Sequence, residues 1–539
     1  MITLRRWLEE NIYALAREMR WSYLPPLMVY LAAGVSGLTA IVGTFFVKNH
    51  LGLSAEFLAA LGFWLGIPYT IKMPIGHVVD LMWRWKGLLV YLGAALIAAS
   101  LMIMVGLINH RPAMEAAMSV ERWFILSSLL SPIGYVIQDV VADAMTVESV
   151  PRFDEGGASI TEDQLKLMHT TMQTLGRVAV IGGGIAVALV NIIVFADSDG
   201  LDKAAKALLY AKVYQWALVI PVVSVLGVML ATVLRARARR RLIATGLSAE
   251  AADRQLDTRT EETVPNPWIL GGSVLFVLFS VSMGLSGFKW KEEVVFIGSM
   301  AIIVVMLAKL TRELVPDARA TLIGTAIVIF VYRAAPGVGD GATWWMIDHL
   351  RFDEHFLSVL EMAGSVLALF GLFIFRRFMA ERSIAHITGF LAITTTLLTL
   401  PTLGMVYGLH DWTSRLTDGA VGARTLMLVN TTISSPLSQL AMIPMLAWIA
   451  RSAPVNLKAT YFAVMASFTN LALAAAQLGT KYLNQIYTVS REVRTPAGDI
   501  QVAADYSQLG DLMMTAMVLG LAMPFAAILF ARWSRFKSV

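Results

Sequence analysis

Apolar runs of 18 or more residues recur along this chain of 539 residues, and each is long enough to cross a lipid bilayer as a helix. Hydrophobic residues make up 57% of the sequence and charged residues only 15%, against about 25% charged in a soluble protein. This composition excludes a soluble enzyme, a disulfide scaffold and a disordered chain. We therefore expect an all-α polytopic membrane protein whose main partner is the lipid bilayer.

Several chemistries are absent from the sequence. It contains no cysteine, which excludes disulfides and thiolate metal sites. It also lacks the Walker, zinc-protease and nucleophile-elbow motifs. The formal net charge of +5 is explained by basic cytoplasmic loops. We therefore expect no enzyme activity, no metal, no cofactor and no nucleic-acid partner.

Fourteen apolar runs bounded by charged residues, proline or glycine are candidate transmembrane helices. They lie near 26–47, 57–80, 86–108, 122–148, 166–196, 208–234, 267–287, 293–310, 319–346, 355–376, 384–408, 425–450, 457–487 and 509–532. The loops that hold most Lys and Arg place both chain termini in the cytoplasm. The expected regions are a cytoplasmic amphipathic N-terminus (1–25), a six-helix bundle (26–234), a cytoplasmic linker (235–266), two extra transmembrane helices (267–310) and a second six-helix bundle (311–539).

An internal repeat supports two homologous halves. Residues 45–58 (FFVKNHLGLSAEFL) match residues 344–357 (WWMIDHLRFDEHFL), and both segments join the first and second helices of a six-helix set. Parallel halves of this kind are typical of the major facilitator fold, in which the substrate binds near mid-membrane between halves that rock. We expect that fold, with about 14 transmembrane helices arranged 6+2+6 and transport by alternating access.

The segment after the second predicted helix, GHVVDLMWRWKG, resembles the loop signature of facilitator transporters. In that signature an acid pairs with basic groups and latches one conformation. The candidate latch residues are Gly76, Asp80, Arg84 and Lys86. An ordinary charged cytoplasmic turn is the alternative interpretation.

Charged side chains inside predicted helices are the candidate functional residues, because a charge within a membrane is costly unless it serves a polar pathway. Asp139 and Asp143 lie one turn apart on one helix face, and two carboxylates so close favour uptake of a proton. Together with Glu148 they are the candidate proton-coupling residues. The candidate substrate ligands are Lys72, Asp139, Asp143, Arg177, Arg333, Gln477 and Lys481. The alternative is a set of internal ion pairs that only fix helix packing.

Four stretches resemble the folate-biopterin transporter family of the major facilitator superfamily. They are residues 37–80 (including FFVKNHLGLSAEFL and IKMPIGHVVD), 138–148 (QDVVADAMTVE), 335–357 (APGVGDGATWWMIDHLRFDEHFL) and 457–479 (LKATYFAVMASFTNLALAAAQLG). Met73 interrupts the I-K-P-x-x-G motif of that family. The resemblance implies a transporter of the cell inner membrane that imports folate or a related pterin by symport with protons.

The resemblance also implies roles for single residues. The glutamate carboxylates of folate would suit Lys72 and Arg177, and the pterin ring would suit Asp139 or Asp143. The acidic fourth helix resembles muropeptide permeases as well, so a muropeptide or another amphipathic solute is the alternative substrate. A pigment or lipid assembly factor without transport activity is the alternative function.

Overall fold

The computed structural model describes residues 19–47, 54–70, 72–150, 160–198, 201–256, 267–310, 316–375, 378, 382–438, 440, 458–494, 500–534 and 536. These residues form two compact units. The first unit comprises Met1–Ala40, Pro74–Val190 and Lys203–Asn266, and the second comprises Ile41–Met73, Asn191–Asp202 and Pro267–Val539.

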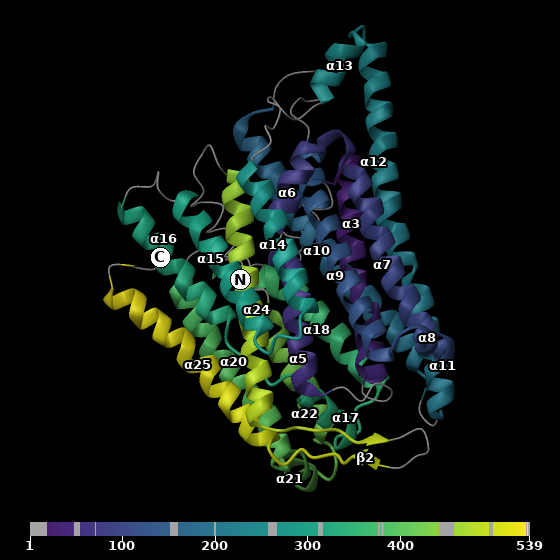
Figure 1. Cartoon of the computed structure of the whole chain (residues 1–539), viewed down its shortest axis with the longest axis vertical. Coiled ribbons are helices and arrows are strands. Elements are labelled where there is room, and N and C mark those ends of the chain that lie inside the picture. Colours follow the sequence, from purple (N-terminus) through teal and green to yellow (C-terminus); the bar gives the residue numbers. More distant parts are fainter. Residues whose placement is uncertain are drawn as a thin grey trace. The chain divides into compact units, whose positions relative to one another are not determined.

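The first unit is helical in all its main elements (Figure 1). Its elements are η2 (Trp21–Tyr23), α3 (Leu24–Val35), η3 (Ser36–Thr39), most of α6 (Lys72–Leu81), η5 (Trp83–Trp85), α7 (Lys86–Asn109), α8 (Arg111–Ala117), α9 (Val120–Ser149), most of α10 (Glu162–Phe195), α11 (Lys203–Ala217), α12 (Val219–Ala244) and α13 (Ala249–Leu256). The basic cluster of the predicted linker continues α12 as helix. Arg239 of that helix pairs with Asp253 of α13 through two hydrogen bonds of 2.7 and 3.1 Å.

The second unit is also helical, apart from one short hairpin. Its helices are α4 (Ala40–Phe46), α5 (Ala55–Thr70), α14 (Pro267–Leu285), α15 (Lys291–Leu310), α16 (Pro316–Arg333), α17 (Gly341–Asp348), α18 (Glu354–Ile374), α20 (Ile384–Val406), α21 (Leu409–Leu416), α22 (Ala423–Ser434), η6 (Ser435–Leu437), α24 (Lys458–Ile486) and α25 (Leu509–Trp533). Strands β1 (Val493–Arg494) and β2 (Ile500–Val502) pair antiparallel between α24 and α25.

Where the structure describes them, the predicted transmembrane runs consist mainly of helix. Residues 441–450 of the predicted run 425–450 lie outside the described residues. Among the described residues, eight helical stretches are long and apolar enough to cross a membrane: Trp21–Phe46, Trp83–Asn109, Val120–Thr146, Thr174–Phe195, Ala205–Ala244, Glu354–Gly371, Ile384–Val406 and Leu509–Trp533. Two shorter apolar helices are Ala55–Tyr69 and Val274–Gly284. The count of 14 and the 6+2+6 division at the predicted boundaries stay predictions. Helices α4 and α5, which the sequence assigned to the first six-helix set, belong to the second compact unit.

The predicted helix 319–346 is shorter in the structure. Helix α16 ends at Arg333, and helical structure resumes only at Gly341. Pro336 has no backbone N–H to donate, and Gly339 has a φ of +79°, which a helix does not accept. Arg333 therefore lies at a helix end and not in the middle of a span.

The internal repeat is visible in the helix boundaries. Helix α5 begins at Ala55 and α18 begins at Glu354, an offset of 299 residues (354 − 55) that equals the offset between the repeated sequences. Each of these helices follows a shorter helix that carries an aromatic pair, Phe45–Phe46 in α4 and Trp344–Trp345 in α17. The two copies thus share a local architecture.

Small residues set the closest helix contacts of the first unit. On α7 and α9, the hydroxyls of Ser100 and Ser127 each donate to the other's carbonyl, at 2.7 and 2.9 Å. On α10, a Cβ at Gly183 would lie 2.7 Å from the carbonyl oxygen of Leu31 on α3. Such contacts let backbones approach inside a membrane, where apolar side chains gain nothing by leaving lipid.

Gly183→Ala is expected to lower the free energy of unfolding by about 1–3 kcal/mol, because the added methyl group must displace the α3 backbone. The neighbouring Gly182 offers a matched control, since a Cβ there meets nothing within 4 Å. Gly182→Ala should be neutral or stabilising by up to about 1 kcal/mol through helix propensity. Thermal unfolding of the detergent-solubilised protein measures both variants. If the two variants unfold at the same temperature, the close contact between α3 and α10 is ruled out.

Candidate functional site

The acidic helix α9 carries the central group of the first unit. The hydroxyl of Tyr30, on α3, donates a 2.6 Å hydrogen bond to Oδ1 of Asp143. Tyr30 is only 8% exposed, so its phenol is held away from lipid and bulk water. On α10, a Cβ at Gly176 would lie 3.0 Å from the Tyr30 ring, so the absence of a side chain there leaves room for the ring. Three helices therefore position this pair.

Two further predicted residues belong to the same group. Asp139 lies one turn before Asp143 on α9, and Arg177 follows Gly176 on α10. Asp139 and Arg177 lie near enough to the Tyr30 hydroxyl to interact with it electrostatically, and Asp143 contacts it directly. Sequence reasoning missed Tyr30, although a buried phenol in an apolar helix generally needs a hydrogen-bond partner.

Gln138 on α9 serves a different purpose. It is buried, and its amide nitrogen donates to the carbonyl of Val90 on α7 at 3.2 Å and to the hydroxyl of Ser224 on α12 at 3.0 Å. These bonds tie three helices together. Gln138 therefore stabilises the packing of α7, α9 and α12, and it does not belong to the acidic group.

Lys86, a predicted latch residue, pairs with Glu148, a predicted proton-coupling residue. The two charged atoms lie 2.6 Å apart, and Lys86 is buried at the start of α7. Arg235 of α12 approaches the same carboxylate at 3.7 Å. The acid in this pair comes from α9, whereas the loop signature pointed to Asp80. The latch and proton-coupling roles of these residues stay predictions.

The other predicted latch residues lie close by in the chain. Arg84 is exposed within η5. Gly76 lies on α6, where a Cβ would stand 3.9 Å from a methyl group of Val140 on α9. The backbone of Asp80 belongs to α6, but its side chain lies outside the part that the structure describes.

The second unit contains a buried ionic cluster around Lys481, a predicted substrate ligand on α24. Its ammonium lies 3.3 Å from Glu292 and 3.3 Å from Glu293, both in the first turn of α15. The hydroxyl of Tyr482 donates to Glu293, and the indole N–H of Trp64 on α5 donates to Glu292 at 3.0 Å. Two carboxylates thus already neutralise the Lys481 charge. The predicted role in substrate binding stays untested.

The remaining predicted ligands also belong to the second unit, whereas Asp139, Asp143 and Arg177 belong to the first. Arg333 donates from Nε to the carbonyl of Thr469 on α24 at 3.1 Å. Gln477 is exposed on α24. Lys72 is half-buried at the first position of α6. Their common role as substrate ligands stays a prediction.

Arg491, between α24 and α25, is a polar residue that sequence reasoning placed only in a loop. It is 2% exposed, donates from Nη1 to the carbonyl of Val47, and lies 4.9 Å over the ring of Trp344. Burial lowers its pKa to about 10, while Asp348 and Asp340 act in the opposite direction. Arg491 therefore contacts both copies of the repeated segment.

A pocket of about 290 Å³ lies beside this arginine in the second unit. Its lining includes Glu56, Trp344, Gln485, Thr488, Arg491 and Val502. The amide of Gln485 donates to Glu56 at 2.6 Å, which joins α24 to the start of α5. No sequence pattern indicated this pocket, because its walls come from three distant parts of the chain.

The profile of the BT1 family matches residues 33–536. The chain belongs to the BT1 family. Among curated relatives, the folate-biopterin transporter of Synechocystis sp. is 23% identical over 482 residues, which cover 87% of this chain and 76% of that protein. The resemblance seen in the sequence is therefore confirmed.

Solved structures confirm the fold of this BT1-family protein. A peptide transporter POT in complex with sulfate has a TM-score of 0.56 at 15% identity, covering 95% of this chain and 94% of the other. A POT family transporter in complex with a thioalcohol-conjugated peptide has a TM-score of 0.58 at 12% identity, with 95% of each chain covered. The expected all-α major facilitator fold is thus correct.

The family and the membrane-length helices together define the general class of the protein. It is a multi-pass membrane transporter for a small molecule, not an enzyme.

Proposed function

We propose that this protein is a secondary active transporter that imports an organic anion, folate or a related pterin, by alternating access and in symport with protons. It resides in the cell inner membrane with both termini in the cytoplasm. The relative named folate-biopterin transporter supports the substrate class. Basic loops on the side of the termini support the orientation.

The Tyr30–Asp143 hydrogen bond is the observation that carries this proposal. It shows an acid inside a membrane helix whose carboxylate is held in a defined geometry, with Asp139 one turn away. Two carboxylates at this spacing repel each other in a low-dielectric site, and binding a proton removes that repulsion. The proposed coupling step is the binding and release of a proton at this pair of carboxylates during alternating access.

The chemistry of a pterin matches the same group. Its amino group and ring N–H are donors that carboxylates accept, and the carboxylates of a folate require cations. Asp139 and Asp143 are the proposed partners of the ring, and Arg177 and Lys72 the proposed partners of the anionic tail. Intramembrane charges that face a polar pathway commonly serve such roles.

Uptake of radiolabelled folate into proteoliposomes tests the proposal. Accumulation should rise when the outside is made acidic and fall to equilibration when a protonophore collapses the pH gradient. Protein-free liposomes are the control. Uptake of neither folate nor a pterin, with or without the gradient, would reject this substrate class. A labelled muropeptide fragment tests the alternative solute, and co-purification with a pigment complex would favour the assembly-factor alternative.

A further inference from the structure

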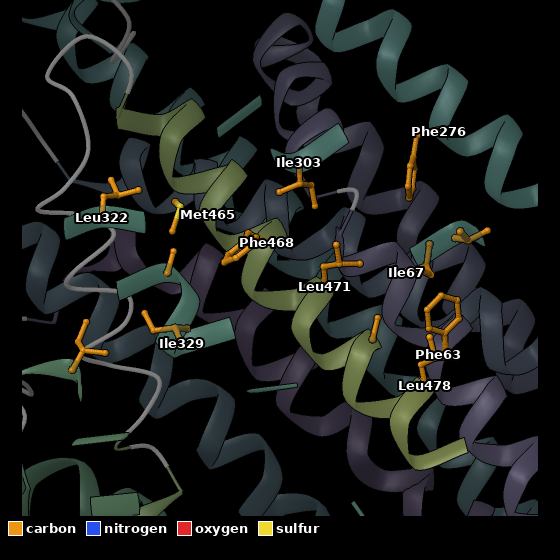
Figure 2. Close-up of a cluster of buried hydrophobic side chains, with 14 residues drawn as sticks. Phe63, Ile67, Phe276, Ile303, Leu322, Ile329, Met465, Phe468, Leu471 and Leu478 are labelled. Atoms are coloured by element: carbon orange, nitrogen blue, oxygen red, sulfur yellow. The ribbon is translucent and has the colours of Figure 1, made fainter. Parts of the chain in front are cut away.

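The two extra helices, α14 and α15, share one hydrophobic core with four other helices of the second unit, α5, α16, α20 and α24. Figure 2 shows side chains from α5, α14, α15, α16 and α24 in this cluster. Members include Phe63 of α5, Phe276 of α14, Ile303 of α15, Ile329 of α16 and Phe468 of α24. The α14–α15 hairpin is therefore built into the unit and is not a loosely attached addition.

A single carboxylate, that of Glu292, joins α15 to α5 and α24. Glu292 of α15 is 5% exposed. One of its oxygens accepts from the indole of Trp64 on α5 at 3.0 Å, and the other lies 3.3 Å from the ammonium of Lys481 on α24. Charge-assisted hydrogen bonds are roughly twice as strong as neutral ones, and burial strengthens them further. Glu292 therefore links α5 to α24 through two polar contacts.

The α5–α24 contact itself is closely fitted through small residues. A Cβ at Gly66 would lie 3.8 Å from Cβ of Ala474, and a Cβ at Gly62 would lie 2.8 Å from Oε1 of Gln477. Helix α5 comes from the first predicted six-helix set and α24 from the second. In alternating access, helices from opposite halves separate on one side of the membrane and close on the other.

We propose that the α14–α15 hairpin is a conformational clasp and that Glu292 is its positioning residue. Its carboxylate stabilises the state in which α5 and α24 are packed together, and transport requires these contacts to break and re-form. The hairpin thereby sets the balance between the two states of the transporter. This inference depends on the protein being a transporter and not on folate being its substrate.

Disulfide cross-linking measures the α5–α24 contact directly, because the natural chain has no cysteine. In the Gly66→Cys/Ala474→Cys protein the two Cβ atoms would lie about 3.8 Å apart, a separation typical of disulfides. Oxidation in membranes should link them readily. The linked protein should lose transport of its substrate and regain it after reduction, with labelled folate as the probe.

Glu292→Gln added to this pair is the decisive variant. The amide keeps the size of the side chain and leaves Lys481 paired with Glu293, so the cluster loses one charge but keeps its ion pair. We expect the rate of disulfide formation to fall roughly threefold, because the charged bridge between α5 and α24 is weakened. Glu292→Asp should restore part of the rate, and Trp64→Phe should lower it.

The Ser100→Cys/Ser127→Cys pair is the matched control. The two hydroxyl oxygens lie 3.1 Å apart between α7 and α9, which both belong to the first predicted set. Its cross-linking should not respond to Glu292→Gln. An unchanged Gly66–Ala474 rate in both Glu292→Gln and Trp64→Phe would overturn the proposal. Equal loss at both pairs in all variants would also overturn it, because the cluster would then merely maintain the fold. Failure of folate uptake alone would bear on the substrate and not on the clasp.

Discussion

Asp143→Asn is expected to abolish proton-driven accumulation while leaving the protein folded. An asparagine at this position still offers an oxygen to the Tyr30 hydroxyl, so the 2.6 Å contact has a substitute. The amide cannot bind and release a proton, so the coupling step is lost. Folding should be retained because the replacement has the same shape and removes a partly buried charge.

The expected effect is large. One pH unit is worth about 1.4 kcal/mol, so a gradient of two units supports up to about 100-fold accumulation at one proton per substrate. Asp143→Asn should reduce this to equilibration in the proteoliposome assay. Counterflow, which needs no net proton movement, should persist. These two readouts separate a coupling residue from one that is needed for folding.

Two companion variants sharpen the result. Asp139→Asn tests whether the neighbouring carboxylate carries the proton instead. Tyr30→Phe removes the hydrogen bond but keeps the acid, so it should weaken coupling without abolishing it. Normal gradient-driven accumulation in Asp143→Asn would show that this acid is structural and would withdraw the proposed coupling site.

Lys481→Met is expected to destabilise the protein more than any other single change proposed for the second unit. Lys481 is the cation that faces Glu292 and Glu293 in the described cluster, and its side chain is 10% exposed. Breaking a buried ion pair by removing one partner typically costs about 3–5 kcal/mol, because a charge stays buried without compensation. The apparent melting temperature in detergent should fall accordingly.

The triple variant Lys481→Met/Glu292→Gln/Glu293→Gln removes all three charges and should recover most of this loss. Arg111→Ala is a control at an exposed ion pair, Arg111–Glu115, where about 0.5 kcal/mol or less is expected. A melting temperature unaffected by Lys481→Met would contradict the ionic cluster. If the triple variant is stable but inactive in transport, the cluster serves function as well as stability.

The sequence located the helices well but not their interruptions. Helix α7 occupies 86–109 against a predicted 86–108, and α20 occupies 384–406 against 384–408. These limits follow from local properties, since a span is a run of apolar residues between charges. The end of α16 at Arg333 was missed, although Pro336 and Gly339 were readable in the sequence. The predicted helix was continued past Pro336 and Gly339 because apolar residues follow them in the sequence.

The sequence also singled out candidate charges but not what they contact. Asp143 and Lys481 were selected because charges are rare in apolar helices, and Lys86 because it belongs to the loop signature. Their partners Tyr30, Glu148 and Glu292 lie 113, 62 and 189 residues away in the chain (143 − 30, 148 − 86 and 481 − 292). Nothing local links such pairs, because only the packing of helices on one another decides them.

By itself the sequence determined that this chain crosses a membrane, where its helices lie, that two segments repeat and which family it resembles. Each of these follows from hydropathy, charge placement or local similarity, which need no knowledge of distant neighbours. The tertiary structure alone decided that Tyr30 binds Asp143, that Glu148 binds Lys86, and that Glu292 of the extra hairpin contacts α5 and α24. A polar group in an apolar interior must find a partner, and the fold determines which partner is within reach.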